Sequence, residues 1–214
     1  MIVLTVADNR SKCFQLERSL NHFGWQYHII EVNQWQGFGT KLNRTYEYLK
    51  ANPTIKDFIF VDAYDTFFLD TPANTKRKIY WNCLFNSEVN CWPDVDQLSK
   101  YEEREQYTKP NTKFRFLNSG AYYMQSETFI KLMESKQIHD SEDDQRVATK
   151  WLLDNPSIGI DHNCRVFQTL CGILPTDYKI ENNQFITKDN FKPTIIHGNG
   201  KADMNFIYEL IQTQ

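Results

Sequence analysis

Two carboxylates lie three residues apart directly after a short apolar run. The run covers residues 58–61, and Asp62 and Asp65 follow it. Repulsion between two such carboxylates costs free energy unless a cation compensates, and their oxygens are ligands that suit Mg²⁺ or Mn²⁺. A solvated acidic turn has the same short pattern. The apolar flanks on both sides, which include residues 67–69, favour the metal site.

A histidine next to glycines near the end of the chain supplies a second candidate ligand. A short strand is predicted over residues 193–196, and His197 follows it, ahead of Gly198, Gly200 and Lys201. Histidine is a common metal ligand, glycine lets the backbone approach a ligand closely, and lysine can pair with phosphate. Taken alone, this motif is better explained by a turn with an incidental histidine.

The first half of the chain alternates apolar strands with helices, which is typical of a parallel sheet covered on both faces. Strands are predicted over residues 2–6, 27–32 and 58–61. The first helix is expected to end at Gly24, and the second to begin with Thr40 as its cap and to end before Pro53. Ligands bind beyond the carboxyl ends of the strands in such sheets, and Asp62 lies at such an end.

The second half mixes strands and helices. Further strands are predicted over residues 79–85, 116–124 and 193–196, and helices over residues 128–135, 143–153 and 202–211. A parallel half followed by a mixed half suits an α/β fold of the GT-A type, which is Rossmann-like and binds nucleotide sugars. We therefore predict a mixed central sheet flanked by helices.

Composition and charge describe one globular domain. The chain has 214 residues, enough for one core and short for two, so a single domain over residues 1–214 is predicted. The net charge of -3 gives no reason to expect nucleic acid as a partner. Nothing in the sequence indicates an oligomeric state.

The five cysteines fit no zinc spacing. We interpret them as mostly buried thiols in a reducing compartment, with one disulfide as the alternative. Neither a signal peptide nor a membrane span is recognisable. We therefore expect the protein to stay where it is made, in the cytoplasm or a host-cell compartment, unless the chain was trimmed.

Taken together, the motifs resemble those of the glycosyltransferase domain of procollagen lysyl hydroxylases, which is similar to collagen galactosyl- and glucosyltransferases. The resemblance covers nearly the whole chain, and several motifs in the same order are more specific than any one of them. They are residues 5–7 (Thr-Val-Ala), 62–65 (Asp-Ala-Tyr-Asp), 91–94 (Cys-Trp-Pro-Asp), 116–120 (Phe-Leu-Asn-Ser-Gly), 143–145 (Asp-Asp-Gln), 160–165 (Ile-Asp-His-Asn-Cys-Arg) and 197–200 (His-Gly-Asn-Gly).

For donor binding, the resemblance implies a UDP-sugar and Mn²⁺ held by Asp62, Asp65 and His197. It implies that Tyr64 packs against or hydrogen-bonds the uridine and that Thr5 lies near the nucleotide. It also implies that the diphosphate meets Gly198, Gly200 and Lys201. Members of the family often have two more residues before this lysine, which follows Gly200 directly here.

For catalysis, the resemblance suggests Trp92, Asn118, Asp143 and Asp144. A carboxylate there can stabilise an oxocarbenium-like transition state, orient the acceptor hydroxyl or accept its proton. If the reaction retains the anomeric configuration, the leaving phosphate can take the proton instead. The same two carboxylates also suit a helix N-terminus, and both roles can hold together. Trp92 is compatible with a core position or with an exposed platform that stacks on a sugar.

Two further motifs allow a structural interpretation. Lys41 follows a glycine-containing loop over residues 37–40 that opens a helix, and this loop either holds an anion or forms a flap over the donor. Asp161, His162 and Arg165 suggest catalysis at first sight, but we expect them to form a buried hydrogen-bonded network that positions neighbouring loops.

The expected reaction is transfer of glucose from UDP-glucose to galactosyl-hydroxylysine of collagen-like chains. UDP-galactose as donor, or hydroxylysine as direct acceptor, is an alternative that the residues do not separate. An inactive sugar-nucleotide-binding or scaffolding module is the alternative from another class, and the full set of metal-ligand candidates argues against it. An oxidoreductase is discounted because no glycine-rich fingerprint follows the first strand.

Overall fold

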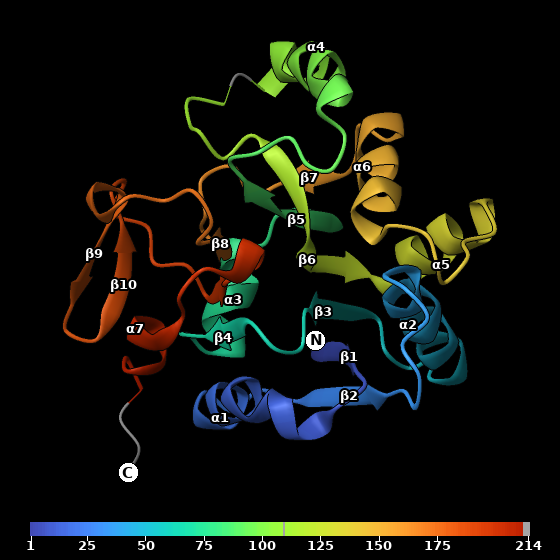
Figure 1. Ribbon diagram of the computed structural model, residues 1–214, viewed down its shortest axis with the longest axis horizontal. Helices are drawn as coiled ribbons and strands as arrows, with labels where there is room; N and C mark the ends of the chain where they lie inside the picture. The colour runs from blue at the N-terminus through green and yellow to red at the C-terminus, as the bar shows by residue number, and fades with distance from the viewer. Residues whose placement is uncertain (109, 212–214) are drawn as a thin grey trace.

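The computed structural model describes residues 1–108 and 110–211 and has a six-stranded mixed sheet at its centre. The strand order is β2-β1-β3-β6-β5-β7 (Figure 1). The strands are β1 (Ile2–Ala7), β2 (Tyr27–Glu31), β3 (Asp57–Val61), β5 (Cys83–Glu88), β6 (Phe116–Gln125) and β7 (Gly159–Ile160). β1, β2 and β3 are parallel, β6 is antiparallel to both β3 and β5, and β7 is parallel to β5. The predicted fold class, a parallel half followed by a mixed half, is confirmed.

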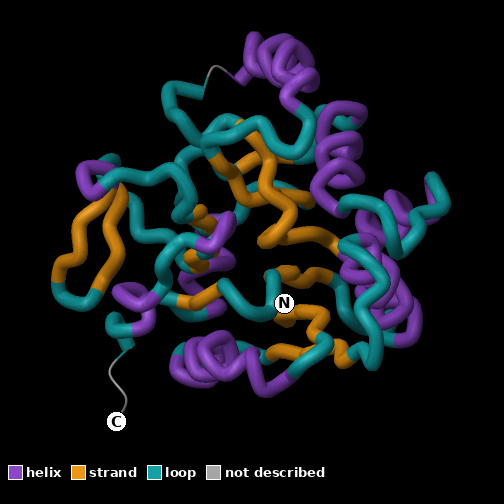
Figure 2. Tube along the Cα trace, in the orientation of Figure 1, coloured by secondary structure: helices purple, strands orange, loops and turns teal. Residues whose placement is uncertain are grey.

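Both faces of this sheet are buried, as the apolar run in β3 requires. Phe58 and Phe60 point into one core, and Ile59 and Val61 point into the other, because successive side chains of a strand face opposite sides. The first core is completed by α2 (Gly39–Ala51), α5 (Ser126–Ser135) and α6 (Asp144–Asp154). The second is completed by α1 (Phe14–His22) and a smaller sheet. Figure 2 shows the strands of the central sheet in the middle of the molecule with helices around them, and a separate two-stranded hairpin at the left edge.

The smaller sheet has the order β4-β11-β8, with β4 at Thr66–Phe68, β11 at Ile195–His197 and β8 at Phe167–Thr169. β11 is antiparallel to β4 and parallel to β8. Its outer side packs against α7 (Asn205–Tyr208) and the hairpin of β9 (Tyr178–Glu181) and β10 (Gln184–Thr187). This sheet therefore joins the end of the chain to the segment that follows β3.

Three predicted elements are wrong in their bounds or caps. The strand predicted over 79–85 begins only at Cys83, because the chain first runs along the surface, where Tyr80 is exposed. The helix predicted over 202–211 covers only α7, which the turn Asn199–Lys201 precedes, with Gly200 at φ 64°. Thr40 does not cap α2. It is the second residue of the helix and its side chain is buried, and the N-cap is Phe38.

The remaining elements were not predicted. They are the strands β4, β7, β8, β9 and β10, the helices α3 (Pro72–Lys78) and α4 (Leu98–Thr108), and the short 3-10 helices Arg10–Cys13, Val95–Gln97 and Pro175–Asp177. In α3 the only buried residue is Thr75, so the sequence has no apolar period there; its start is marked by Thr71, whose side chain accepts from the Asn74 amide.

All five cysteines carry free thiols, and Cys13, Cys83 and Cys164 are buried, which agrees with the interpretation as buried thiols rather than the disulfide. Across residues 1–108 and 110–211, none of the helices has the length and apolar character needed to span a bilayer.

Candidate active site

The three predicted metal ligands meet where the two sheets join. Asp62 and Asp65 lie in the connection from β3 to β4, and β4 pairs with β11 so that Thr66 lies opposite His197. His197 Nε2 is therefore 3.5 Å from Asp65 Oδ2 and 3.8 Å from Asp62 Oδ2. One donor atom from each of the three residues lies within 4.8 Å of the others. This Asp62–Asp65–His197 group, the triad below, is compact enough to hold one metal ion.

The side-chain amide of Asn118 orients the imidazole. Asn118 donates its Nδ2 to Glu88 Oε1 at 3.0 Å, and its Oδ1 accepts the Gly120 amide at 3.0 Å. The same Oδ1 lies 2.9 Å from His197 Nδ1, so Nδ1 carries the proton and donates. Nε2 is the nitrogen that faces the two carboxylates. This is the arrangement that a metal-binding histidine requires.

Gly120 in β6 leaves the space that the triad occupies. A Cβ at this position would lie 2.1 Å from His197 Cε1 and 2.7 Å from Asp62 Oδ2. The Gly120 carbonyl also accepts the Asp62 amide at 2.7 Å. The glycine of the Phe-Leu-Asn-Ser-Gly motif thus allows the close approach of β6 to both ligands.

Lys41 is a buried cation that joins the triad to the start of α6. Its Nζ lies 2.8 Å from Asp62 Oδ1 and 2.7 Å from Asp144 Oδ2, and Ser119 Oγ donates to the same Asp144 oxygen at 2.9 Å. Burial acts to lower the pKa of Lys41, but Asp62 and Asp144 outweigh it and raise the pKa above its ordinary value. Lys41 is therefore a fixed positive charge at the site.

The loop before Lys41 lies directly on the segment that precedes α6. A Cβ on Gly37 would lie 2.3 Å from the Asp140 carbonyl oxygen, and one on Gly39 would lie 2.2 Å from that of His139. The Gly39 amide donates to Asp140 at 3.0 Å. Lys41 pairs with two carboxylates of the chain itself, those of Asp62 and Asp144. The two predictions for this loop, an anion-binding loop and a flap over the donor, did not include these pairs.

Burial and the neighbouring charges shift the pKa values of the triad residues in opposite directions. Burial raises the pKa of Asp62, and Lys41 and His197 offset this only in part. Burial acts on Asp65 in the same direction, but His197 and Lys41 together outweigh it and lower the pKa. For His197, burial lowers the pKa, and Asp65 and Asp62 together raise it by more, so the net direction is upward. A half-buried pair of carboxylates beside a buried imidazole is a site that a divalent cation would stabilise.

Two cavities meet at the triad. The first, the Tyr64 cavity, has a volume of about 640 Å³ and is lined by Tyr64, Gly198 and Lys201 among others. The second, the Asn118 cavity, has a volume of about 410 Å³. Asp62 and Asp65 line both, as do Phe38 and Lys41. A ligand that spans the two cavities must therefore pass the triad.

Tyr64 forms a fixed wall of its cavity. Its hydroxyl accepts the amides of Asp8 at 3.1 Å and Asn9 at 3.0 Å and donates to the Asp8 carboxylate, while its side chain stays exposed. Val6 and Asp8 line this cavity. Thr5 is buried with 1% of its surface exposed and does not line either cavity.

The remaining predicted residues line the Asn118 cavity. Asp143 caps α6, since its Oδ1 accepts the Arg146 amide at 2.9 Å, so the predicted helix N-terminal role is confirmed. Trp92 is 66% exposed, which contradicts the core position and leaves the exposed platform. The other predicted residues on this cavity are Asn118, Asp144 and Gly200.

Glu88 is the main buried polar group that the sequence reasoning missed. It is 5% exposed and accepts hydrogen bonds from three amides, those of Asn118, Gln145 and Asn199. Burial raises the pKa of Glu88. A glutamate at the end of an apolar strand is the one signal that marks it, whereas Gln145 and Asn199 lie inside motifs already singled out.

Asp161 forms the predicted structural network. Its carboxylate accepts the backbone amides of Arg165, Val166 and Phe167, and His162 Nδ1 lies 2.8 Å from the Phe114 carbonyl. The Arg165 side chain is not part of this network, because its guanidinium lies over the Phe191 ring, 4.6 Å from the centroid.

The mixed central sheet flanked by helices is that of the GT-A fold. A glycosyltransferase involved in the glycosylation of the major capsid of PBCV-1 has a similar structure, with a TM-score of 0.53 over 98% of this chain and 97% of that one, at 11% identity. The chain itself matches the PLOD GT domain over residues 1–212 and belongs to this family of nucleotide-sugar-dependent transferases.

Curated relatives agree with this assignment. An uncharacterized protein of Acanthamoeba polyphaga mimivirus is 30% identical over 83% of this chain and 40% of its own length. A multifunctional procollagen lysine hydroxylase and glycosyltransferase of Caenorhabditis elegans is 26% identical over 97% of this chain and 32% of its own length. The chain thus spans between a third and two fifths of the length of these relatives.

Proposed function

We propose that the protein transfers glucose from UDP-glucose to galactosyl-hydroxylysine of collagen-like chains with the help of Mn²⁺. The observation that carries this proposal is the triad between two cavities, since a sugar diphosphate needs a cation between a nucleoside site and a sugar site. The collagen-like acceptor is suggested by the relatives, which are named for the modification of procollagen lysine. The metal is suggested by the donors: carboxylates favour Mg²⁺, Ca²⁺ or Mn²⁺, and an imidazole favours transition metals, so Mn²⁺ suits both.

In the proposed complex, the nucleoside lies in the Tyr64 cavity. The Tyr64 ring is held upright by its hydrogen bonds to the backbone of Asp8 and Asn9 and offers an apolar wall for a base. Gly198 and Lys201 line the same cavity and can meet the diphosphate. A divalent cation bound by the triad would neutralise the charge that develops on the diphosphate as it leaves.

The sugar and the acceptor hydroxyl lie in the Asn118 cavity. Lys41 holds Asp144 at this cavity, and Ser119 adds a second hydrogen bond to the same carboxylate oxygen. Asp144 is thereby fixed as a carboxylate that can stabilise positive charge at the reacting carbon or orient the acceptor hydroxyl. Trp92 extends from the rim as an apolar surface, and such surfaces stack on sugar rings.

A UDP-release assay tests the proposal. We expect release with UDP-glucose and Mn²⁺ to rise when a peptide carrying galactosyl-hydroxylysine is added, and to be lost in Asp65→Ala, which keeps its fold by circular dichroism. A preference for UDP-galactose, or for unmodified hydroxylysine, would replace the substrates but keep the enzyme class. No Mn²⁺-dependent release with any UDP-sugar would contradict the proposal and favour the inactive module.

A further inference from the structure

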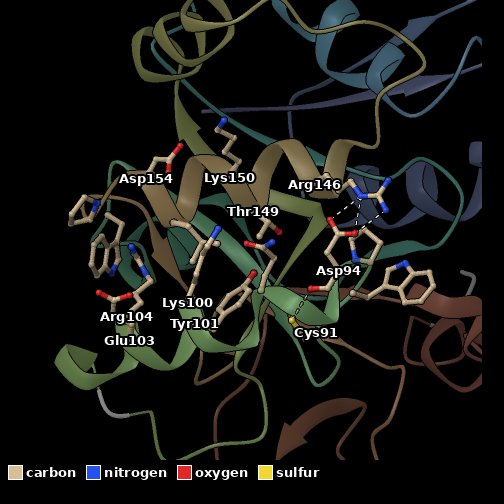
Figure 3. Close-up of a pocket in the computed structure, with 16 residues that line it drawn as sticks. Cys91, Asp94, Lys100, Tyr101, Glu103, Arg104, Arg146, Thr149, Lys150 and Asp154 are labelled. Carbon is tan, nitrogen blue, oxygen red and sulfur yellow. Dashed lines mark hydrogen bonds and ion pairs between the residues drawn. The ribbon is translucent and has the colours of Figure 1, made fainter.

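A groove of about 960 Å³ lies between α4 and α6 (Figure 3). α6 lines it with Arg146, Thr149, Lys150, Leu153 and Asp154, whose spacing of three and four places them on one face of the helix. The facing stripe comes from α4 and includes Lys100, Tyr101 and Arg104. Figure 3 shows the side chains of Tyr101 and Thr149 between the two helices.

The groove lies next to the Asn118 cavity. Trp92 lines both, and α6 begins at the cavity with Asp144 and continues along the groove. At the junction, the Arg146 guanidinium binds both carboxylate oxygens of Asp94, with Nε–O distances of 3.0 and 2.8 Å. This ion pair fixes the loop that carries Trp92 against α6.

Two tryptophans and two prolines are among the residues that line the groove. They are Trp92, which also lines the Asn118 cavity, Pro93, Trp81 and Pro156. Trp81 is 42% exposed and packs on Gly159, where a Cβ would lie 2.6 Å from the indole. Aromatic-lined grooves of this kind bind extended proline-rich chains, whose polyproline II form is already ordered and loses little entropy on binding.

The length of the groove sets the length of chain that it can hold. α6, which forms one wall of the groove, has 11 residues and is about 16 Å long at about 1.5 Å per residue. A polyproline II chain rises about 3.1 Å per residue, so about five residues fit beside α6. The groove carries both ammonium and carboxylate side chains, among them Lys100 and Asp154, which suits a polypeptide of mixed charge better than a polyanion.

We propose that the α4–α6 groove binds the acceptor polypeptide, as an extended proline-containing segment on one side of the residue that receives the sugar. This inference rests on the proposed function, because the acceptor hydroxyl there belongs to a side chain of a polypeptide. That polypeptide must leave the Asn118 cavity, and the groove lies on the other side of Trp92, which lines both.

Direct binding tests this inference without turnover. The probe is a fluorescein-labelled peptide of about ten residues with repeated glycine, proline and lysine, followed by fluorescence anisotropy. We expect Trp81→Ala to weaken its affinity by about tenfold, while Tyr80→Ala leaves it unchanged. Tyr80 is the matched control, since it precedes Trp81, is 79% exposed and does not line the groove. Equal affinities in the two variants would overturn the inference.

A charge variant covers the case in which Trp81→Ala fails to fold. Lys100→Glu in the groove is expected to raise the affinity for the lysine-containing peptide, because it replaces a cation with an anion. Lys76→Glu on α3, which is exposed and outside the groove, is expected to leave the affinity unchanged. Binding of an unlabelled oligosaccharide in the groove, with no binding of the peptide, would also overturn the inference.

Turnover separates this inference from the proposed function. With free galactosyl-hydroxylysine as acceptor, Trp81→Ala is expected to release UDP like the unaltered protein. With peptides, KM is expected to fall as one flank grows to about five residues and then level off, and this gain is expected to be absent in Trp81→Ala. UDP release that never depends on peptide length contradicts the groove alone. Peptide binding without any UDP release contradicts the proposed function alone.

Discussion

At the scale of single residues, the site depends on how closely β6 approaches the triad. Gly120 is the residue that permits this approach, because a Cβ there would collide with His197 and Asp62. Asn118, two residues earlier, directs Nε2 of the same histidine toward the carboxylates. The geometry of the triad is therefore set by a strand that supplies none of its ligands.

Substitution of Gly120 tests this dependence. Gly120→Ala is expected to reduce Mn²⁺ affinity and turnover by about 100-fold and to lower the free energy of unfolding by about 1–3 kcal/mol, since the new methyl group displaces the imidazole. Isothermal titration with Mn²⁺ and chemical denaturation measure the two effects.

Gly24→Ala is the matched control for that substitution. Gly24 has a φ of +72°, and a methyl group added there would have no heavy atom within 4 Å, so the substitution is expected to cost about 1 kcal/mol of stability and to leave Mn²⁺ binding unchanged. If Gly120→Ala binds Mn²⁺ as well as Gly24→Ala does, the approach of β6 is not what shapes the triad.

The roles of Asp144 and Asp143 can be distinguished by a similar pair of substitutions. Asp144→Asn keeps the shape of the side chain but removes one of the two anions at Lys41, so we expect kcat to fall by about 100-fold with UDP affinity nearly unchanged. Asp143→Asn keeps the helix cap, because asparagine caps as well as aspartate, and is expected to affect kcat less. A parallel loss of UDP affinity and kcat in Asp144→Asn would assign Asp144 a structural role.

At the scale of elements, burial decides what the sequence could predict. The four residues of β3 that precede Asp62 are all buried, so an apolar run marked this strand clearly. α4 packs on the core through Tyr101, and its sequence is otherwise polar, so no periodic apolar face indicated it. The bounds of β5 were misplaced because Tyr80 and Trp81 look like strand residues but lie on the surface.

The connection between β7 and β8 is expected to make stability depend on pH. Burial lowers the pKa of His162 below its ordinary 6.5, so the unfolded chain takes up this proton at a higher pH than the folded chain. The contribution of His162 is fully present above about pH 6.5 and is lost as the pH falls toward the folded pKa. Denaturation of His162→Gln at several pH values is expected to show a smaller loss of stability in this window.

His139→Gln serves as the control for this pH dependence, because His139 is exposed. It is expected to follow the unaltered protein at every pH. A pH dependence of His162→Gln that matches that of His139→Gln would show that the buried imidazole does not contribute.

At the scale of the whole molecule, the site forms where three distant parts of the chain converge. The triad ligands could be predicted from sequence, because each follows a recognisable strand and belongs to a motif. The pairing of Lys41 with Asp144 could not, since it depends on how α2 lies beside α6. The buried role of Glu88 could not be predicted for the same reason, because its amide partners come from β6, α6 and the turn after β11.

The central claim is that Asp62, Asp65 and His197 hold one divalent cation between a nucleoside site and a sugar site. The most direct measurement is anomalous diffraction from crystals grown with Mn²⁺ and UDP. We expect one manganese peak within coordination distance of all three side chains, with the diphosphate on its open side and the uridine in the Tyr64 cavity. UDP bound in that cavity with manganese elsewhere, or with none, would contradict the claim.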